Sequence, residues 1–127
     1  MEASYCLDTN ILIDYFRGQQ ESVELVRSLL KQGKVYTTEI TRFELCSGES
    51  YPKAKPIITL FFDYITILPF EKNCAEKAGE IYRKFKKVGN LPNISDILIA
   101  AIAISHNLTV VTKNRKDFER IDGVKLY

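Results

Sequence analysis

Acidic side chains follow predicted strands or open predicted helices at several separate points of the chain. Asp8 ends the β-prone run SYCLD, Asp96 opens an apolar helix, and Asp117 follows the fourth predicted strand. Glu44 lies about one turn into the helix after the second predicted strand, so it can lean back toward the same edge. The carboxyl ends of parallel strands lie together, and side chains that follow them converge there. The pattern therefore predicts a cluster of carboxylates at one end of a sheet.

A cluster of carboxylates is costly by itself, because the charges repel one another and raise each other's pKa. A hard divalent cation such as Mg²⁺ or Mn²⁺ offsets that repulsion, since it takes oxygen ligands and usually keeps several waters. One of these waters can be deprotonated as a nucleophile while the cation offsets charge on a phosphoryl oxygen. The acids therefore predict metal-assisted hydrolysis of a phosphate ester.

The sequence offers no competing set of catalytic residues. His106 is the only histidine and stands near a predicted helix end without Cys or His neighbours, and no phosphate-binding glycine loop or GxSxG motif is present. Phosphatases and phosphotransferases also use an Asp after the first strand, but the phosphatase pattern has a second acid two residues later, where this chain has Asn10. A phospho-acceptor domain would need a late Lys, and Lys113 follows the fourth strand instead of the last.

Each acid also has an ordinary structural explanation. Asp8 can cap the helix that follows it, and Asp96 is a favourable charge in a first helical turn. A Glu on a short helix, such as Glu44, is usually solvated, and Asp117 stands in a charged run. Three other acids are interpreted as surface or capping residues: Asp14, Glu39 and Asp63.

Short β-prone runs alternate with helical ones along the whole chain. Strands are predicted at residues 4–8, 35–38, 65–70, 108–112 and 124–127, with Pro69 indicating an edge strand. Helices are predicted at 9–17, 21–32, 39–46, 57–64, 73–88 and 96–106, with a helical turn at 114–120. Gly33 is a candidate C-cap and Ser95 a candidate N-cap. This order predicts one domain over residues 1–127, an α/β fold of the three-layer α/β/α type with a mostly parallel central sheet of about five strands.

The apolar residues indicate which helix faces are buried. Helix 73–88 is amphipathic, whereas the run 97–104 is apolar nearly all round, which predicts burial on more than one side. The inner positions of helix 21–32 are predicted to be Val23, Leu25, Val26, Leu29 and Leu30. Those of helix 73–88 are predicted to be Cys74, Ala75, Ala78, Ile81, Tyr82 and Phe85. Five apolar residues in helix 57–64 exceed what so small a helix buries, which predicts a partly exposed interface: Ile57, Ile58, Leu60, Phe61 and Phe62.

Length and composition place the chain among folded single domains. At 127 residues and 46% hydrophobic content it can bury a core without disulfides or a structural metal. Cys6, Cys46 and Cys74 are widely spaced without a CxxC pair, so we expect buried thiols in a reducing compartment. The longest apolar run is far shorter than the roughly 20 residues of a membrane span, and no secretory signal pattern is seen. We therefore expect a cytoplasmic protein that does not enter the membrane.

The net charge hides a more basic surface. Eighteen Lys and Arg against sixteen Asp and Glu give +2, which alone argues against a nucleic-acid partner. With the four candidate acids assigned to a cation site, the remaining surface carries +6, which suits an RNA backbone. Lys113, Arg115 and Lys116 stand next to the site and are candidates for gripping phosphates, although a solvated loop explains each equally well. Lysines 84, 86 and 87 are interpreted as a solvated helix face.

Four sequence blocks follow one another along the chain: YCLDTNILIDYF, ITRFELCSG, SDILIAAIAISHNLTVVT and TKNRKDFERIDGVKLY. In this order they resemble a PIN-domain ribonuclease, and specifically the toxin of the VapBC toxin–antitoxin type. The resemblance implies that catalysis and metal binding fall on five residues: Asp8, Glu44, Asp96, Asn114 and Asp117. It also implies supporting roles for three polar residues, Thr9 and Asn10 in the DTN turn and Thr112 after the fourth strand.

This chain departs from many PIN domains at one position, where Asn114 stands in place of an Asp. A neutral Asn would hold a metal-bound water, whereas Asp117 could ligate the cation or stand behind the ligands, so both assignments stay open. The resemblance implies an endoribonuclease that uses Mg²⁺ or Mn²⁺, acts as a homodimer and is blocked by the tail of a partner antitoxin. The alternative is a non-catalytic PIN-like scaffold that binds RNA or protein.

Overall fold

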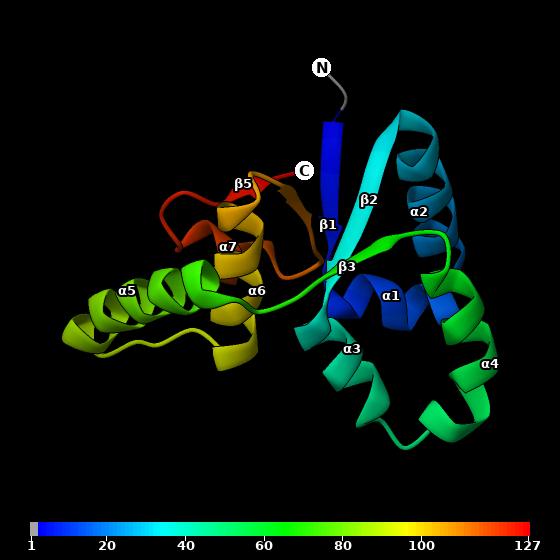
Figure 1. Cartoon of the computed structure of the whole chain (residues 1–127), viewed down its shortest axis with the longest axis horizontal. Coiled ribbons are helices and arrows are strands. Elements are labelled where there is room, and N and C mark those ends of the chain that lie inside the picture. The colour runs from blue at the N-terminus through cyan, green and yellow to red at the C-terminus, as the bar shows by residue number, and fades with distance from the viewer. Residues whose placement is uncertain (1–2) are drawn as a thin grey trace.

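A computed structural model describes residues 3–127, in which strands and helices alternate as predicted (Figure 1). The strands within this range are β1 (Ala3–Leu7), β2 (Gly33–Thr38), β3 (Thr66–Leu68), β4 (Thr109–Val111) and β5 (Lys125–Leu126). The helices are α1 (Thr9–Phe16), α2 (Gln20–Gln32), α3 (Glu39–Cys46), α4 (Tyr51–Phe62), α5 (Lys72–Val88), α6 (Ile94–Ser105) and α7 (Arg115–Glu119). All five described strands pair in parallel, in the order β3-β2-β1-β4-β5. The predicted α/β fold with its parallel sheet is confirmed.

Helices cover both faces of the sheet, which gives the three layers. In Figure 1, α5, α6 and α7 lie on one side of β1, and α1, α2 and α4 lie on the other. The two cores follow from the alternation along β1, because Cys6 belongs to the α5–α6 core while Tyr5 and Leu7 belong to the opposite one. Helix α6 is apolar nearly all round and is buried on most of its circumference, as predicted.

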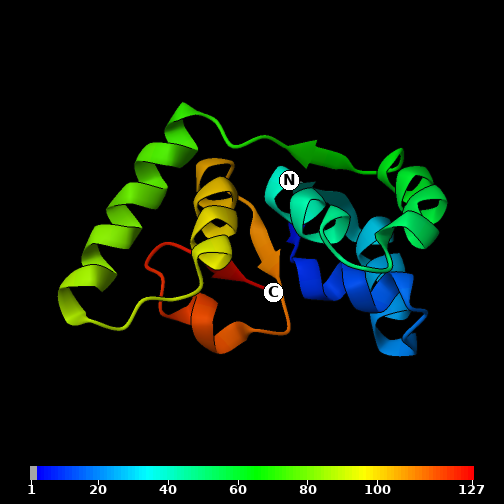
Figure 2. The same cartoon turned by 90° about the horizontal axis from the view of Figure 1, so that it is seen from below.

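The order of the strands reverses between β1 and β4, where a functional crevice is expected. The chain builds β1, β2 and β3 in one direction, then crosses over to place β4 on the other side of β1. In parallel sheets the crevice outside the carboxyl ends opens where the strand order reverses in this way. Figure 2, seen from below, looks onto this end of the sheet, where α1, α3 and α6 begin.

Proline and glycine explain where element boundaries differ from the prediction. Helix α4 begins at Tyr51 rather than at residue 57, because Pro52 lies in its first turn, where a missing N–H costs nothing, and Pro56 is tolerated inside the helix. Gly33 does end α2, but it also begins β2, where a side chain would meet the backbone of Ala3. Pro69 follows β3, which is an edge strand as predicted.

Several predicted side-chain positions are wrong. Ser95 lies inside the first turn of α6, and Asn93 takes the N-cap position. Leu30, Ala75 and Cys46 are exposed rather than buried, because each lies on the solvent side of its helix. Cys6 and Cys74 are buried, as expected.

The apolar residues of α4 divide between core and surface. Ile58, Phe61 and Phe62 are buried in the core beside α1 and α3. Ile57 and Leu60 are each 61% exposed, so part of this helix presents apolar surface as predicted. No helix within residues 3–127 combines the length and apolar character that crossing a membrane requires.

Candidate active site

Asp8 lies at the junction of β1 and α1, where it caps the helix and also contacts the segment after β4. Its side chain is 3% exposed, Oδ1 accepts from the backbone N–H of Thr9 at 2.7 Å, and Oδ2 accepts from Thr112 Oγ1 at 2.7 Å. Burial raises the pKa of Asp8, hydrogen bonds from Thr112 and Thr9 lower it, and the charge of Glu44 raises it further. Capping of α1 therefore accounts for the contact of Oδ1 but not for the contact of Oδ2 with Thr112.

Thr112 connects the first and fourth strands at the crevice. Its hydroxyl donates to Asp8 and accepts from the backbone N–H of Asn114 at 2.9 Å. The backbone N–H of Asp8 in turn donates to the carbonyl of Val111 at 3.0 Å, which extends the pairing of β1 with β4. These bonds hold the start of the β4–α7 loop against the start of α1.

Asn114 joins the two acids on the far side of the crevice. Its Nδ2 donates to Asp96 Oδ2 at 3.1 Å and to Asp117 Oδ2 at 2.7 Å. Asp96 lies in the first turn of α6 and is 6% exposed. Burial raises its pKa to about 6, and the charges of Asp8, Asp117 and Glu44 contribute to the increase.

Glu44 is only partly exposed on α3, contrary to the solvated position that a short helix usually gives. Its Oε1 accepts from Thr9 Oγ1 at 2.6 Å, so a side chain at the start of α1 holds it. Its charge contributes to the raised pKa values of both Asp8 and Asp96. The four acids named from the sequence therefore lie near enough to influence one another.

The basic residues beside the site are mostly engaged with acids. Lys113 pairs with Asp14 on α1, which brings together residues 99 positions apart, and Arg115 lies 3.7 Å from Glu119. Lys116 is exposed on α7. The other predicted supporting residue, Asn10, is exposed at the start of α1, so its side chain lies outside the contacts described above.

Two residues of this region are absent from the site residues predicted from the sequence. Thr41 is completely buried on α3, with its hydroxyl 3.0 Å from that of Thr9. Arg120 lies 3.8 Å from Asp117 Oδ1 and stacks over the ring of Phe85 on α5. The signal that could have found Thr41 is its place in the block ITRFELCSG, three residues before Glu44, which puts both side chains on one face of the helix.

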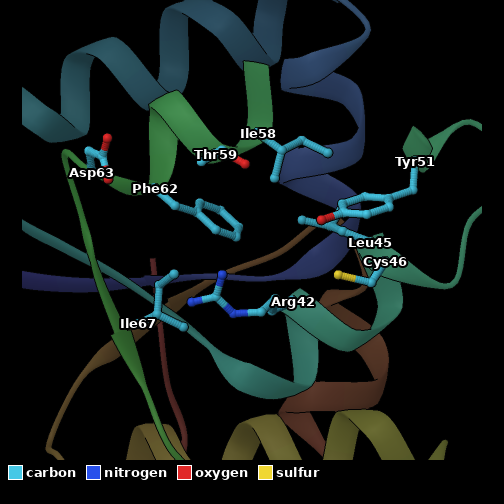
Figure 3. A pocket seen from close by; sticks show the side chains of 9 residues that line it. All are labelled: Arg42, Leu45, Cys46, Tyr51, Ile58, Thr59, Phe62, Asp63 and Ile67. Carbon is cyan, nitrogen blue, oxygen red and sulfur yellow. The ribbon is translucent and has the colours of Figure 1, made fainter. Parts of the chain in front are cut away.

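Two cavities lie on α3 and α4, and only one of them reaches an acid of the site. The pocket in Figure 3 lies between α3, α4 and β3, and Arg42 extends into it over the ring of Phe62, at 5.3 Å from the ring centroid. None of the four site acids lines it. A larger cleft of about 760 Å³ lies between α1, α3 and α4 and has Glu44 in its wall.

The donor chemistry of the site fits a hard cation. All the candidate donors are carboxylate or amide oxygens, the ligands that Mg²⁺ and Mn²⁺ take. Within residues 3–127, no three His, Cys, Asp or Glu side chains converge as a ready metal site. Hydrogen bonds from Thr9, Thr112 and Asn114 occupy carboxylate oxygens in this arrangement, so a cation would have to draw the acids together.

One protein family, described as the PIN domain, matches residues 5–124. This chain belongs to the PIN-domain family. The resemblance of the four sequence blocks to that family is therefore confirmed. The part played by each site residue of this PIN domain stays a prediction.

Relatives of this PIN domain carry the name VapC. Ribonuclease VapC1 of Methanocaldococcus jannaschii is 33% identical, over 99% of this chain and 88% of that protein. The tRNA(fMet)-specific endonuclease VapC of Shigella flexneri is 30% identical, over 95% of this chain and 94% of that protein. The solved structure of VapBC-1 from nontypeable Haemophilus influenzae is 27% identical with a TM-score of 0.83, covering 98% of this chain and 96% of that one. Within its family, the chain is VapC-like.

Proposed function

We propose that this VapC-like PIN domain is a divalent-cation-dependent endoribonuclease that hydrolyses RNA phosphodiester bonds. The observation that carries the proposal is that Asp8, Glu44 and Asp117 lie close enough to Asp96, beyond the carboxyl ends of β1 and β4, for their charges to act on it. Burial is the largest cause of the raised pKa of Asp96, and the charges of the other three acids raise it further, an arrangement that costs stability unless a cation offsets it. The names of the relatives, ribonuclease and endonuclease, support RNA as the substrate.

The chain's own residues would divide the work of holding the cation. Asp8 and Asp96 are the proposed ligands, and Glu44 would hold a second cation or orient the attacking water. When bound, Mg²⁺ or Mn²⁺ would supply Lewis acidity at the phosphoryl oxygen and lower the pKa of water. Asn114 uses its amide nitrogen for Asp96 and Asp117, so its amide oxygen would be the atom that holds a water of the cation's shell.

Hydroxyl and amide donors would set the direction of these carboxylates. Thr112 and the backbone of Thr9 each hold one oxygen of Asp8, and Asn114 holds one oxygen of Asp96. Fixed carboxylates would let the water attack in line with the leaving oxygen of the RNA strand. Lys113, Arg115 and Lys116 would contact flanking phosphates, the first two after exchanging their present acidic partners for the RNA.

We also propose that the protein is the toxin of a toxin–antitoxin pair and assembles as a homodimer. Support for a partner comes from the VapBC-1 structure that this fold resembles. Ile57 and Leu60 on α4 offer exposed apolar surface for a protein contact. Light scattering on the purified chain would give its oligomeric state, and a monomer at micromolar concentration would contradict the homodimer.

The decisive experiment compares purified wild type with Asp8→Asn on total RNA, and sequences the cleaved ends. We expect the wild type to cleave with Mg²⁺ or Mn²⁺ and to stop with EDTA, and Asp8→Asn to leave the RNA intact. Asp63→Asn is the matched control, because Asp63 is an exposed acid at the end of α4, outside the crevice. Equal cleavage by wild type and Asp8→Asn would show that the assignment is wrong.

The alternative function, a non-catalytic scaffold, gives a different result in the same experiment. The observation that favours a scaffold is that, within residues 3–127, no three acidic, His or Cys side chains lie close enough together to hold a metal ion as they stand. A scaffold would bind RNA or protein without cutting RNA. It would also show no heat of binding when titrated with Mn²⁺, whereas the proposed nuclease binds the cation.

A further inference from the structure

Three buried threonine hydroxyls form a chain that ends on Glu44. Thr38 at the end of β2 lies 3.4 Å from Thr41 on α3, measured between Oγ1 atoms, and Thr41 lies 3.0 Å from Thr9 at the start of α1. Thr9 Oγ1 lies 2.6 Å from Glu44 Oε1. The three hydroxyls come from three different elements, and all three residues are buried.

Counting protons fixes the direction of the hydrogen bonds between the three hydroxyls and Glu44. A hydroxyl donates one proton, and a carboxylate only accepts. The contact from Thr9 to Glu44 is the shortest, so the Thr9 proton lies there and Thr9 must accept from Thr41. Thr41 has then used its own proton, and the remaining proton in the Thr38–Thr41 contact comes from Thr38.

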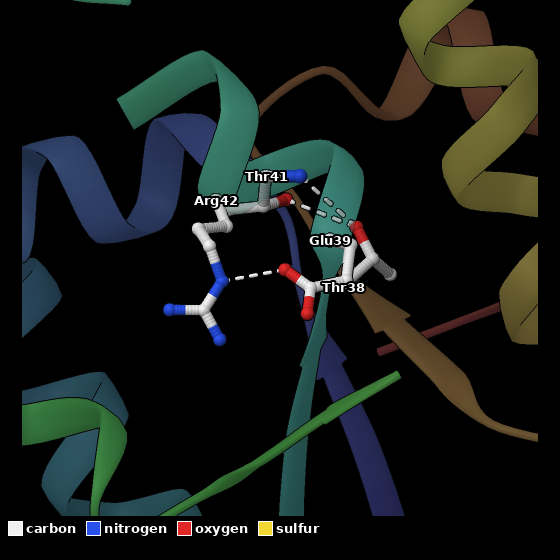
Figure 4. Close-up of polar contacts among 4 residues, drawn as sticks. All are labelled: Thr38, Glu39, Thr41 and Arg42. Atoms are coloured by element: carbon white, nitrogen blue, oxygen red, sulfur yellow. Dashed lines mark hydrogen bonds and ion pairs between the residues drawn. The ribbon is translucent and has the colours of Figure 1, made fainter. Parts of the chain in front are cut away.

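The end of the hydroxyl series remote from Glu44 is anchored by a backbone hydrogen bond. The backbone N–H of Thr41 donates to Thr38 Oγ1 at 3.1 Å, as the N-cap bond of α3 (Figure 4). Each hydroxyl in such a series polarises the next, and burial removes competing water. The bond that holds Glu44 is therefore strengthened by the two threonines behind it.

The exposed side of the first turn of α3 makes no hydrogen bond with the series of threonine hydroxyls described above. Figure 4 shows the ion pair of Glu39 with Arg42, at 2.5 Å, apart from the contacts of Thr38 and Thr41. Glu39 and Arg42 are exposed, whereas the two threonines are completely buried. Glu39 therefore offers a control that perturbs the start of α3 without touching a hydroxyl of the chain.

We propose that Thr41, supported by Thr38, is a positioning residue that orients the Glu44 carboxylate through Thr9. The proposal rests on the role given to Glu44 in the proposed function. Because the hydrogen bonds that connect the Thr41 hydroxyl with Glu44 run through the Thr9 hydroxyl, the effect of that hydroxyl on the reaction should exist only while Glu44 is a carboxylate.

A double-mutant cycle between Thr41→Val and Glu44→Gln tests this dependence. Val keeps the shape of Thr and removes the hydroxyl. We expect Thr41→Val to lower kcat about tenfold with KM little changed, the lower end of losses seen when groups that orient metal ligands are removed. In the Glu44→Gln background the same change should alter kcat less than about twofold, because coupled residues are non-additive. Thr41→Ser should restore the rate, and Glu39→Gln should leave it unchanged.

A second measurement does not depend on catalysis. In crystal structures of the cation-free variants, we expect the Thr9–Glu44 contact to be lost in Thr41→Val and kept in Thr41→Ser. An unchanged contact in Thr41→Val, or equal losses of kcat in both Glu44 backgrounds, would overturn the proposal. If the wild type cleaves no RNA, the proposed function fails, and the crystal structures still decide whether Thr41 positions Glu44.

Discussion

Asn114 donates a hydrogen bond to Asp96 at 3.1 Å from the same amide nitrogen that donates to Asp117 at 2.7 Å. Both partners are carboxylates, so the nitrogen and not the oxygen of this amide must face them. The amide thus stands between two like charges and reduces their repulsion. Asp117 is held a second time by Arg120, whose Nη1 lies 3.8 Å from its other oxygen.

These contacts predict that Asn114 matters more than Asp117 for cation binding. Asn114→Ala removes the donor from both acids, and we expect it to weaken Mn²⁺ binding by about tenfold or more. Asp117→Asn removes a charge that already has two protein partners, so we expect a smaller loss. Calorimetric titration of both variants with Mn²⁺ measures the difference, and a larger loss in Asp117→Asn would identify Asp117 as the ligand.

We predict that Asp8→Asn stabilises the cation-free protein while it abolishes cleavage. Burial raises the pKa of Asp8, so at neutral pH the ionised carboxylate opposes folding. Removing the charge should raise the midpoint of thermal unfolding in EDTA at pH 7.5. The gain should disappear below the ordinary Asp pKa of 3.8, where Asp8 is protonated in both folded and unfolded chains. A lower unfolding midpoint for Asp8→Asn at pH 7.5 would mean that the buried charge of Asp8 does not destabilise the folded protein.

Asp96 should make the stability of the cation-free protein depend on pH in a defined window. Its pKa is about 6 in the folded chain and 3.8 ordinarily, so between these values the folded state binds more protons. The free energy of unfolding should therefore fall as the pH rises from about 4 to about 7. Denaturant titrations in EDTA should show a shallower fall in Asp96→Asn than in the wild type, and identical slopes would contradict the shift.

The three thiols should react very differently in the native protein. Cys46 is exposed, whereas Cys6 and Cys74 are buried, and burial together with the charge of Asp8 raises the pKa of Cys6 to about 12. We expect iodoacetamide to label Cys46 alone in the folded chain and all three cysteines in denaturant. Peptide mass spectrometry locates the label, and Cys46→Ser should abolish labelling of the folded protein.

Two glycines should respond to Ala in opposite directions. A Cβ at Gly33 would lie 2.1 Å from the carbonyl oxygen of Ala3, so Gly33→Ala must separate β1 from β2 and should cost about 1–3 kcal/mol. Gly79 lies inside α5, and a Cβ there meets its nearest neighbour at 3.8 Å, so Gly79→Ala should gain about 0.5–1 kcal/mol. Urea unfolding of both variants measures these changes, and a neutral Gly33→Ala would show that the two strands can adjust.

Local patterns in the sequence predicted the frame of the site well. The end of the first strand placed Asp8 and the start of the apolar helix placed Asp96, and the alternation of strands and helices predicted the parallel sheet. Prolines misled at α4, because Pro52 and Pro56 resemble helix breakers but are accommodated within the helix. Cys46 misled because its residue type suggested burial, while its helix face is solvated.

Contacts between distant residues could not be predicted in the same way. Lys113 and Asp14 are 99 positions apart, and only the packing of α1 against the β4–α7 loop brings them together. Thr41 carries no charge, and its place between the hydroxyls of Thr9 and Thr38 appears only in the folded structure.

The bond from Thr112 to Asp8 joins residues 104 positions apart, and β5 pairs with β4, the segment just before Thr112. A chain still being synthesised therefore carries Asp8, Glu44 and Asp96 before the segment that completes their surroundings has been made. A product cut short before Thr112 would have three of the acids and no closed site. If the protein cleaves RNA as proposed, the ribosome that makes it would be spared its activity until the segment from Thr112 onward has been made.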